Sequence, residues 1–123
     1  MNRVVAADWN SGIVVAEAGL TLAELIRISV PRGWFPPVTP GTKMVTLGGA
    51  VANDVHGKNH HRMGTFGRHV RSVTLHRSDA GVITSSPIER AELFAATIAG
   101  LGLSGVILTV ELQLQPLKSS RNV

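Results

Sequence analysis

The clearest pattern of hydrophobic and polar positions lies near the end of the chain. From Leu108 to Gln115 every second residue is apolar, which is the two-residue period of a strand with one buried face. We therefore expect a strand over residues 106–115, ended by Pro116. Its core face should carry Leu108, Val110, Leu112 and Leu114, and its other face Thr109, Glu111, Gln113 and Gln115.

Shorter apolar runs predict the other strands. Residues 4–7 and 13–16 are expected to pair around a turn at 8–12, and residues 70–76 and 82–85 around a turn at 78–81. Residues 45–47 are expected to be extended. The small residues at 48–52 predict either a helical turn or a close-packed loop.

Capping signals and apolar spacing predict a first helix over residues 21–30. Thr21 and Glu24 have the spacing of a capping box, and Pro31 with Gly33 should end the helix. The face expected to be buried carries Leu22, Leu25, Ile26 and Ser29.

A second capping pattern, Ser86 with Glu89 and Pro87 at the first helical position, precedes a helix expected over residues 91–98. The segment 34–37, Trp-Phe-Pro-Pro, should be rigid and extended, with its aromatic rings packed under the central loop.

The order of these elements is strands, helix, loop, hairpin, helix and strand. Because hairpin-length links outnumber crossovers, it predicts an α+β fold with a mainly antiparallel sheet flanked by helices. The chain has 123 residues, 44% of them hydrophobic, which suffices for one modest core. We expect one folded unit over residues 1–116 and a frayed tail over 117–123.

Composition narrows the possible partners. A formal net charge of +4 favours phosphates, anionic lipids or nucleic acid. An aromatic content of 4% offers no stacking platform for single-stranded nucleic acid, so we expect no nucleic-acid partner. The absence of cysteine excludes disulfides, thiolate metal sites and cysteinyl cofactor links. We expect a cytoplasmic location, with the periplasm or a membrane surface as alternatives.

Glycine and histidine are concentrated in residues 40–70. Glycine lets a ligand approach the main chain closely, and cations between 40 and 77 outnumber the single carboxylate, Asp54. A diphosphate held by backbone N–H groups would explain both features. A long solvated loop that needs glycine to turn explains the composition equally well.

Two motifs point to other functions. Residues 100–105 match G-x-G-x-x-G, but here a predicted helix precedes the glycines and a strand follows, the reverse of a dinucleotide fold. Asp54, His56, His60 and His61 could ligate zinc or iron in a metallohydrolase. Lys58 and Arg62 lie among them and oppose a divalent cation, so we expect no metal site.

Several short motifs together resemble the FAD-binding domain (PCMH type) of the vanillyl-alcohol-oxidase family of flavoproteins. They are P-G-T at 40–42, V-T-L-G-G-A at 45–50, D-V-H-G-K-N-H-H at 54–61 and G-T-F-G at 64–67. Within that family the chain is most similar to the branch that supplies the oxidase component of decaprenylphosphoryl-ribose epimerase, and less similar to the sugar-lactone oxidases. The resemblance extends from about residue 13 to residue 115.

The resemblance implies that FAD lies extended against the central loop. Residues 41–49 would contact the diphosphate and ribityl chain, residues 53–56 with Gly64 the flavin end, and Ile107 the cofactor through its backbone. The cofactor-binding residues implied in this way are Gly41, Thr42, Thr46, Leu47, Gly48, Gly49, Asn53, Asp54, Val55, His56, Gly64 and Ile107.

It further implies an FAD-dependent oxidoreductase that oxidises an alcohol carbon of a sugar, a sugar lactone or a polyprenyl-phosphate-linked sugar. Lys58 would hold a substrate phosphate or hydroxyl, and His56 would orient the flavin or move a proton. A membrane surface is a possible partner of the full-length protein.

Members of the family also carry an upstream glycine-rich FAD-binding loop and a downstream substrate domain. The chain is therefore expected to be a fragment, the second subdomain of the FAD-binding domain, which alone is inactive and holds FAD weakly or not at all. The hypothesis from another class is a small basic domain that binds phosphorylated ligands or nucleic acid and performs no chemistry.

Overall fold

The computed structural model describes residues 2–36, 45–53, 69–79, 81–99 and 105–117. Its elements in chain order are β1 (Val4–Asp8), β2 (Ile13–Glu17), α1 (Leu22–Ser29), η1 (Val30–Arg32), β3 (Trp34–Phe35), α2 (Leu47–Asn53), β4 (Val70–Arg77), β5 (Gly81–Ser85), α3 (Ala91–Ala99), β6 (Val106–Gln113) and β7 (Gln115–Pro116).

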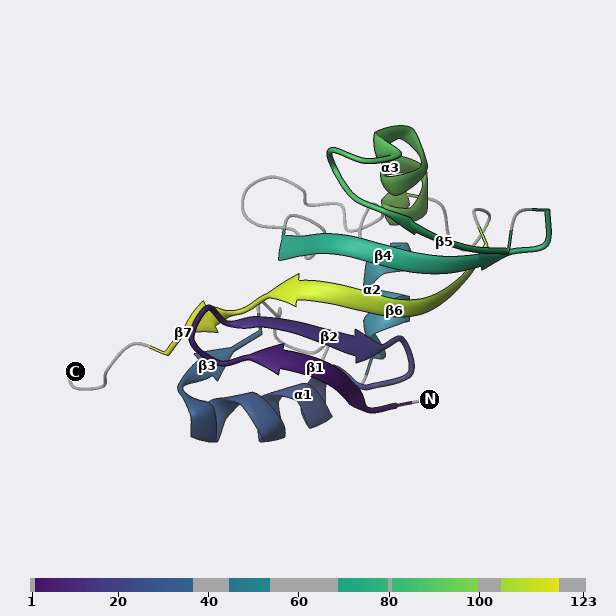
Figure 1. Ribbon diagram of the computed structural model, residues 1–123. Helices are drawn as coiled ribbons and strands as arrows, with labels where there is room; N and C mark the ends of the chain where they lie inside the picture. Colours follow the sequence, from purple (N-terminus) through teal and green to yellow (C-terminus); the bar gives the residue numbers. More distant parts are fainter. Residues whose placement is uncertain (1, 37–44, 54–68, 80, 100–104, 118–123) are drawn as a thin grey trace.

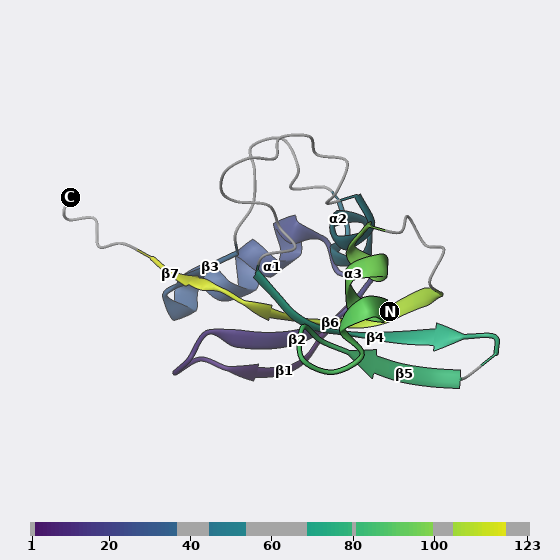
Figure 2. The ribbon, with the colours of Figure 1, turned by 90° about the horizontal axis from the view of Figure 1, so that it is seen from above.

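The architecture is a five-stranded sheet in the order β1-β2-β6-β4-β5 and a small sheet made of β3 and β7. Every pairing within both sheets is antiparallel. Figures 1 and 2 show α1, α2 and α3 on one face of the large sheet. The predicted α+β fold is thus confirmed.

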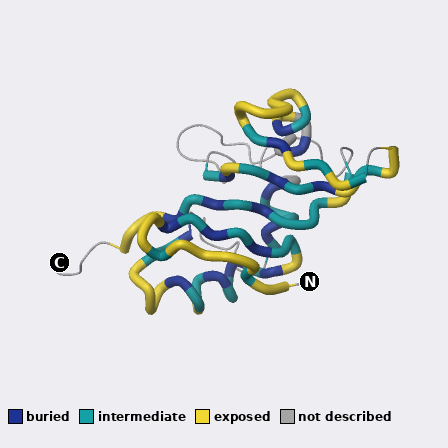
Figure 3. The backbone as a smooth tube through the Cα atoms, viewed as in Figure 1, coloured by how far each residue is buried: buried dark blue, intermediate teal, exposed yellow. Residues whose placement is uncertain are grey.

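The core lies between the sheet and the helices. Alternate residues of the central strands face it, including Val14 and Ala16 of β2, Val73 and Leu75 of β4, and Val110 and Leu112 of β6. The helices contribute Leu22, Leu25, Val51 and Phe94. In Figure 3 the buried backbone follows the middle of the sheet and the inner sides of the helices, while β1 is largely exposed.

The alternation predicted for the last long strand is correct except at its start. Val110, Leu112 and Leu114 are buried, but Leu108 is only half-buried, and Ile107 packs against the core instead. The cause is a shift in the β4–β6 register, where Thr74 pairs with Thr109 but Leu75 pairs with Ile107. Leu108 is the extra residue of β6, and it moves the side chains that precede it to the opposite face of the sheet. The alternation in the sequence does not reveal this shift.

The end of this strand also differs from the prediction. Pro116 does not stop the chain from pairing, because β7 aligns Pro116 with Trp34 and Gln115 with Phe35. Leu117, expected to begin the frayed tail, donates its N–H to the carbonyl of Gly33 at 2.9 Å. Residues 118–123 lie outside the described residues.

The first helix forms as its capping box predicts. The N–H of Glu24 donates to Thr21 Oγ1 at 3.1 Å, and the N–H of Thr21 donates to Glu24 Oε1 at 3.4 Å. Leu22, Leu25 and Ser29 are buried, whereas Ile26 is half-buried. The helix gives way to η1, which ends at Gly33 in the left-handed conformation (φ 89°).

The second capping pattern forms a closed turn rather than a helix start. Ser86 Oγ accepts from the N–H of Glu89 at 3.0 Å, but Ser86 and Glu89 also exchange backbone bonds. Arg90 then adopts a φ of 56°, which a right-handed helix cannot contain. The helix therefore starts at Ala91, and Pro87 is not its first residue.

Trp34 packs on the β1–β2 turn, and most of the central loop that was expected to cover it lies outside the described residues. Its indole Nε1 donates to the carbonyl of Trp9 at 2.8 Å. Gly12, in this turn, has a φ of +79°, and a Cβ atom there would lie 2.4 Å from the Trp34 ring. Gly12 is thus needed both for its backbone conformation and for the approach of the indole.

This double constraint gives a testable prediction. Gly33→Ala adds a Cβ at φ +89° with nothing within 4 Å, so we expect only the conformational cost, roughly 1–2 kcal/mol. Gly12→Ala adds the clash with Trp34 and should lose about 1–3 kcal/mol more. Urea denaturation measures both variants, and an equal loss in the two would show that Trp34 does not press on Gly12.

Candidate functional site

The structure describes only part of the predicted site. Thr46, Leu47, Gly48 and Gly49 lie at the start of α2, Asn53 ends that helix, and Ile107 lies near the start of β6. The other predicted residues are outside the described residues: Gly41, Thr42, Asp54, Val55, His56, Lys58 and Gly64, as well as the metal candidates His60 and His61.

The first turn of α2 is held by the segment between β2 and α1. The N–H of Leu47 donates to the carbonyl of Leu20 at 2.8 Å, and that of Gly48 donates to the carbonyl of Ala18 at 3.0 Å. In return the N–H of Leu22 donates to the carbonyl of Val45 at 3.0 Å. Thr46, expected to be extended, forms an isolated bridge to Thr21, and the helix begins one residue later.

Thr46 caps the helix through its side chain. Its Oγ1 accepts from the N–H of Gly49 at 3.0 Å, and its carbonyl accepts from the N–H of Ala50 at 2.8 Å. A hydroxyl both accepts and donates, and no acceptor for the Thr46 proton is found among the described residues. Thr46 is half-buried.

These bonds occupy three amides of the predicted cofactor site. Residues 41–49 were expected to contact the diphosphate and ribityl chain through their backbone and small side chains, and here the amides of Leu47, Gly48 and Gly49 each donate to a protein oxygen. Whether these residues line the cofactor through side chains or carbon atoms stays a prediction.

The two glycines of this turn have packing reasons of their own. A Cβ on Gly48 would lie 3.0 Å from the Cβ of Ala18. One on Gly49 would lie 3.1 Å from both Thr46 Oγ1 and Val45 Cγ2. Leu47 and Val51, on the inner side of the same helix, are fully buried. The close approach at these glycines is therefore between α2 and the neighbouring residues of the protein, Ala18, Val45 and Thr46.

The same segment links α2 to Leu108, the residue that follows Ile107 in β6. The N–H of Ala18 donates to the carbonyl of Leu108 at 2.9 Å, while the carbonyl of Ala18 accepts from Gly48. The N–H of Ala18 thus bonds to β6 at the register shift, and its carbonyl bonds to the start of α2. The structure therefore brings together two parts of the predicted site that are about 60 residues apart in sequence.

Glycine also positions the start of β6. Gly105 has a φ of +139°, and a Cβ there would lie 2.8 Å from the carbonyl oxygen of His76. This residue belongs to the G-x-G-x-x-G match, whose other glycines lie outside the described residues. As expected, α3 precedes the match and β6 follows it, so the match is not a dinucleotide fingerprint.

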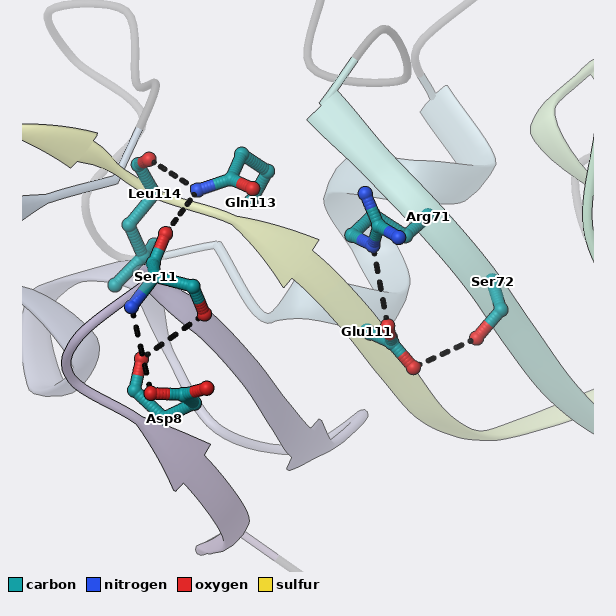
Figure 4. A network of polar contacts seen from close by, with 7 residues as sticks. All are labelled: Asp8, Ser11, Arg71, Ser72, Glu111, Gln113 and Leu114. Atoms are coloured by element: carbon teal, nitrogen blue, oxygen red, sulfur yellow. Dashed lines mark hydrogen bonds and ion pairs between the residues drawn. The ribbon is translucent and has the colours of Figure 1, made fainter.

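Polar contacts of β6 with β4 and with the β1–β2 turn add to the pairing of the sheet, as Figure 4 shows. Glu111 of β6 accepts from Arg71 Nε at 3.2 Å and from Ser72 Oγ at 3.4 Å, at the register shift in β4. Gln113 Nε2 donates to the carbonyls of Ser11 and Leu114. In the sequence these residues look like the solvated face of a strand.

The β1–β2 turn contains one perturbed carboxyl. The N–H of Asn10 donates to Asp8 Oδ1 at 2.9 Å, and this bond lowers the pKa of Asp8 below its ordinary value. The described residues hold no cluster of three or more potential metal ligands. Within the same residues, no helix has both the length and the apolar character needed to cross a membrane.

Comparison with known proteins places these features in context. The FAD binding domain family matches residues 1–86. Decaprenylphosphoryl-beta-D-ribose oxidase of Mycolicibacterium smegmatis is 40% identical over 121 residues, which are 98% of this chain and 26% of the relative. L-gulonolactone oxidase of Mus musculus is 34% identical over 118 residues, which are 94% of this chain and 26% of the relative.

A solved structure shares the fold. The crystal structure of 6-hydroxy-D-nicotine oxidase from Arthrobacter nicotinovorans aligns with a TM-score of 0.76 at 24% identity, over 94% of this chain and 25% of that chain. The chain thus spans about a quarter of the length of the relatives it matches.

The contact between Gly48 and Ala18 predicts a compensated pair of substitutions. Ala18 is held by hydrogen bonds on both sides, so it cannot yield to a new Cβ. Gly48→Ala gains roughly 1 kcal/mol of helix propensity but should lose more through overpacking, about 1–3 kcal/mol. Adding Ala18→Gly should recover the loss.

Urea denaturation of the two single variants and the double variant gives the coupling energy, which we expect to be about 1 kcal/mol or more. If the changes in the free energy of unfolding of the two single variants add exactly in the double variant, Gly48 and Ala18 are not coupled. That result would contradict the packing described here.

Proposed function

The chain belongs to the FAD binding domain family, and from this premise we propose that it forms part of an FAD-dependent oxidoreductase that oxidises an alcohol carbon of a sugar. The observation that carries the proposal is the similarity over nearly the whole chain to two sugar-directed oxidases, at 40% and 34% identity. Because the chain spans about a quarter of each relative, the activity belongs to a larger whole.

A polyprenyl-phosphate-linked sugar is the substrate class we favour over a sugar lactone. The decaprenylphosphoryl-ribose oxidase has the higher identity of the two relatives. Lys58 and Arg62, with few carboxylates nearby, also suit a substrate that carries a phosphate.

The described residues would form one side of the FAD site and would contribute one hydroxyl donor, that of Thr46. Thr46 would donate its hydroxyl proton to a cofactor oxygen, while Leu108, the residue after Ile107, is linked to Gly48 through Ala18. The remaining donors would come from Gly41, Thr42, Asn53 to His56 and Gly64, which flank α2 in the sequence. FAD, when bound, supplies the ring that accepts a hydride.

His56 and Lys58 are the residues we propose for the chemistry. The ammonium of Lys58 would donate hydrogen bonds to the substrate phosphate or hydroxyl and so hold the alcohol carbon in place. An imidazole nitrogen of His56 would take the hydroxyl proton as the alcohol becomes a carbonyl, or would hold the cofactor in position.

A segment exchange tests this function directly. Residues 1–123 would replace the matching segment of the Mycolicibacterium smegmatis relative, and the purified chimera would be assayed for bound flavin and for oxidation of decaprenylphosphoryl ribose. We expect flavin at near-unit stoichiometry and measurable activity. His56→Ala in the chimera should slow flavin reduction about 100-fold or more, and Lys58→Met should raise the KM about tenfold.

Lys118→Met, in the expected tail, is the matched control and should leave both parameters unchanged. A chimera that melts at the temperature of the parent enzyme but purifies without flavin would refute the cofactor assignment. Flavin binding without sugar oxidation would refute the substrate class alone.

A further inference from the structure

Two of the exposed apolar side chains, Val30 and Leu117, lie at one end of the molecule, whereas Val5, Val82, Ile88 and Val106 are exposed on β1, on β5, before α3 and at the start of β6. Val30 is 36% exposed and Leu117 is 43% exposed. Gly33 joins them, because its N–H donates to the carbonyl of Val30 and its carbonyl accepts from the N–H of Leu117, both at 2.9 Å. Figures 1 and 2 show the C-terminal end of α1, the β3–β7 pair and the β1–β2 turn together at this end.

Arginine and tryptophan complete this surface. The guanidinium carbon of Arg32 lies 5.3 Å from the centroid of the Trp9 ring, and the carbonyl of Trp9 accepts from the Trp34 indole. Arg27 lies three residues before Val30, on the same side of α1, and is exposed. We call Trp9, Arg27, Val30, Arg32 and Leu117 the end patch.

No ion pair within the described residues neutralises the arginines of the end patch. Arg3, Arg71 and Arg77 each pair with a carboxylate at 3.2–3.5 Å. Among the described residues, Arg27 and Arg32 have no such partner. Asp8 lies next to Trp9 in the sequence, and Glu24, three residues before Arg27, is bonded to Thr21.

Each residue alone has an ordinary explanation. Arg27 suits a helix C-terminus, the Arg32–Trp9 stack stabilises a turn, and single exposed apolar residues are common. These explanations do not account for the presence of two exposed aliphatic side chains, Val30 and Leu117, at the same end as two arginines that have no ion-pair partner among the described residues. The end patch combines exposed aliphatic side chains, the indole of Trp9 and arginines. This combination suits the interface of a membrane with anionic headgroups.

We propose that the end patch docks reversibly on an anionic lipid surface. A second copy of the chain fits less well, because a two-fold contact would set the like-charged arginines against each other. The contact is peripheral and weak, since two arginines and two partly exposed aliphatic side chains carry it. It does not depend on the enzymatic activity proposed above.

Vesicle binding tests this proposal with the 123-residue chain. Co-sedimentation at low ionic strength would compare vesicles of phosphatidylglycerol and phosphatidylcholine with vesicles of phosphatidylcholine alone. We expect binding to the anionic vesicles, and Arg27→Gln with Arg32→Gln should reduce the partition coefficient roughly tenfold or more. Arg71→Gln with Arg77→Gln changes the net charge equally and should reduce it less than about threefold.

Tryptophan fluorescence locates the contact. Lipids brominated on their acyl chains should quench the emission, and Trp9→Phe should remove most of that quenching. The proposal is overturned by an equal effect of the two arginine pairs, by quenching that Trp9→Phe leaves intact, or by equal binding to neutral vesicles. If the chain self-associates and the variant with Arg27→Gln and Arg32→Gln does not, the partner of the end patch is a second copy of the chain. The membrane proposal would then be overturned.

Discussion

The docking of α2 on the Ala18–Leu20 segment is the constraint on which the site depends. A helix of seven residues is too short to be stable by itself, so its position comes from its contacts. Its first two amides donate to the carbonyls of Leu20 and Ala18, and Leu47 and Val51 insert into the core. Because Ala18 also bonds to Leu108, one short segment fixes the helix, the central strand and the spacing between them.

This arrangement changes the meaning of the glycines. Gly48 and Gly49 fit a ligand-approach motif in the sequence, yet in the structure they let the helix approach Ala18 and let Thr46 cap it. Their amides donate to the carbonyl of Ala18 and to Thr46 Oγ1. The family assignment stands on the sequence match and is unaffected. The cofactor contact that we propose therefore falls to the hydroxyl of Thr46 and to residues that flank α2.

The sequence predicted the elements with strong local signals. The capping box at Thr21 and the alternation from Thr109 to Leu114 both formed, because each depends on residues a few positions apart. The errors arose where a distant partner decides. The register of β4 against β6 packs Ile107 against the core in place of Leu108, β3 extends pairing as far as Pro116, and Gly12 makes room for Trp34. The role of Ala18 gave no signal, since nothing in the sequence marks a small residue as a neighbour of Gly48.

Hydrogen exchange of individual amides, measured with and without FAD, tests the central claim most directly. If the start of α2 is held by protein carbonyls, the amides of Leu47 and Gly48 exchange slowly in the absence of FAD, at rates similar to those of β2 and β6. Rapid exchange without FAD, followed by protection when FAD is added, would show that these amides serve the cofactor and would contradict the account.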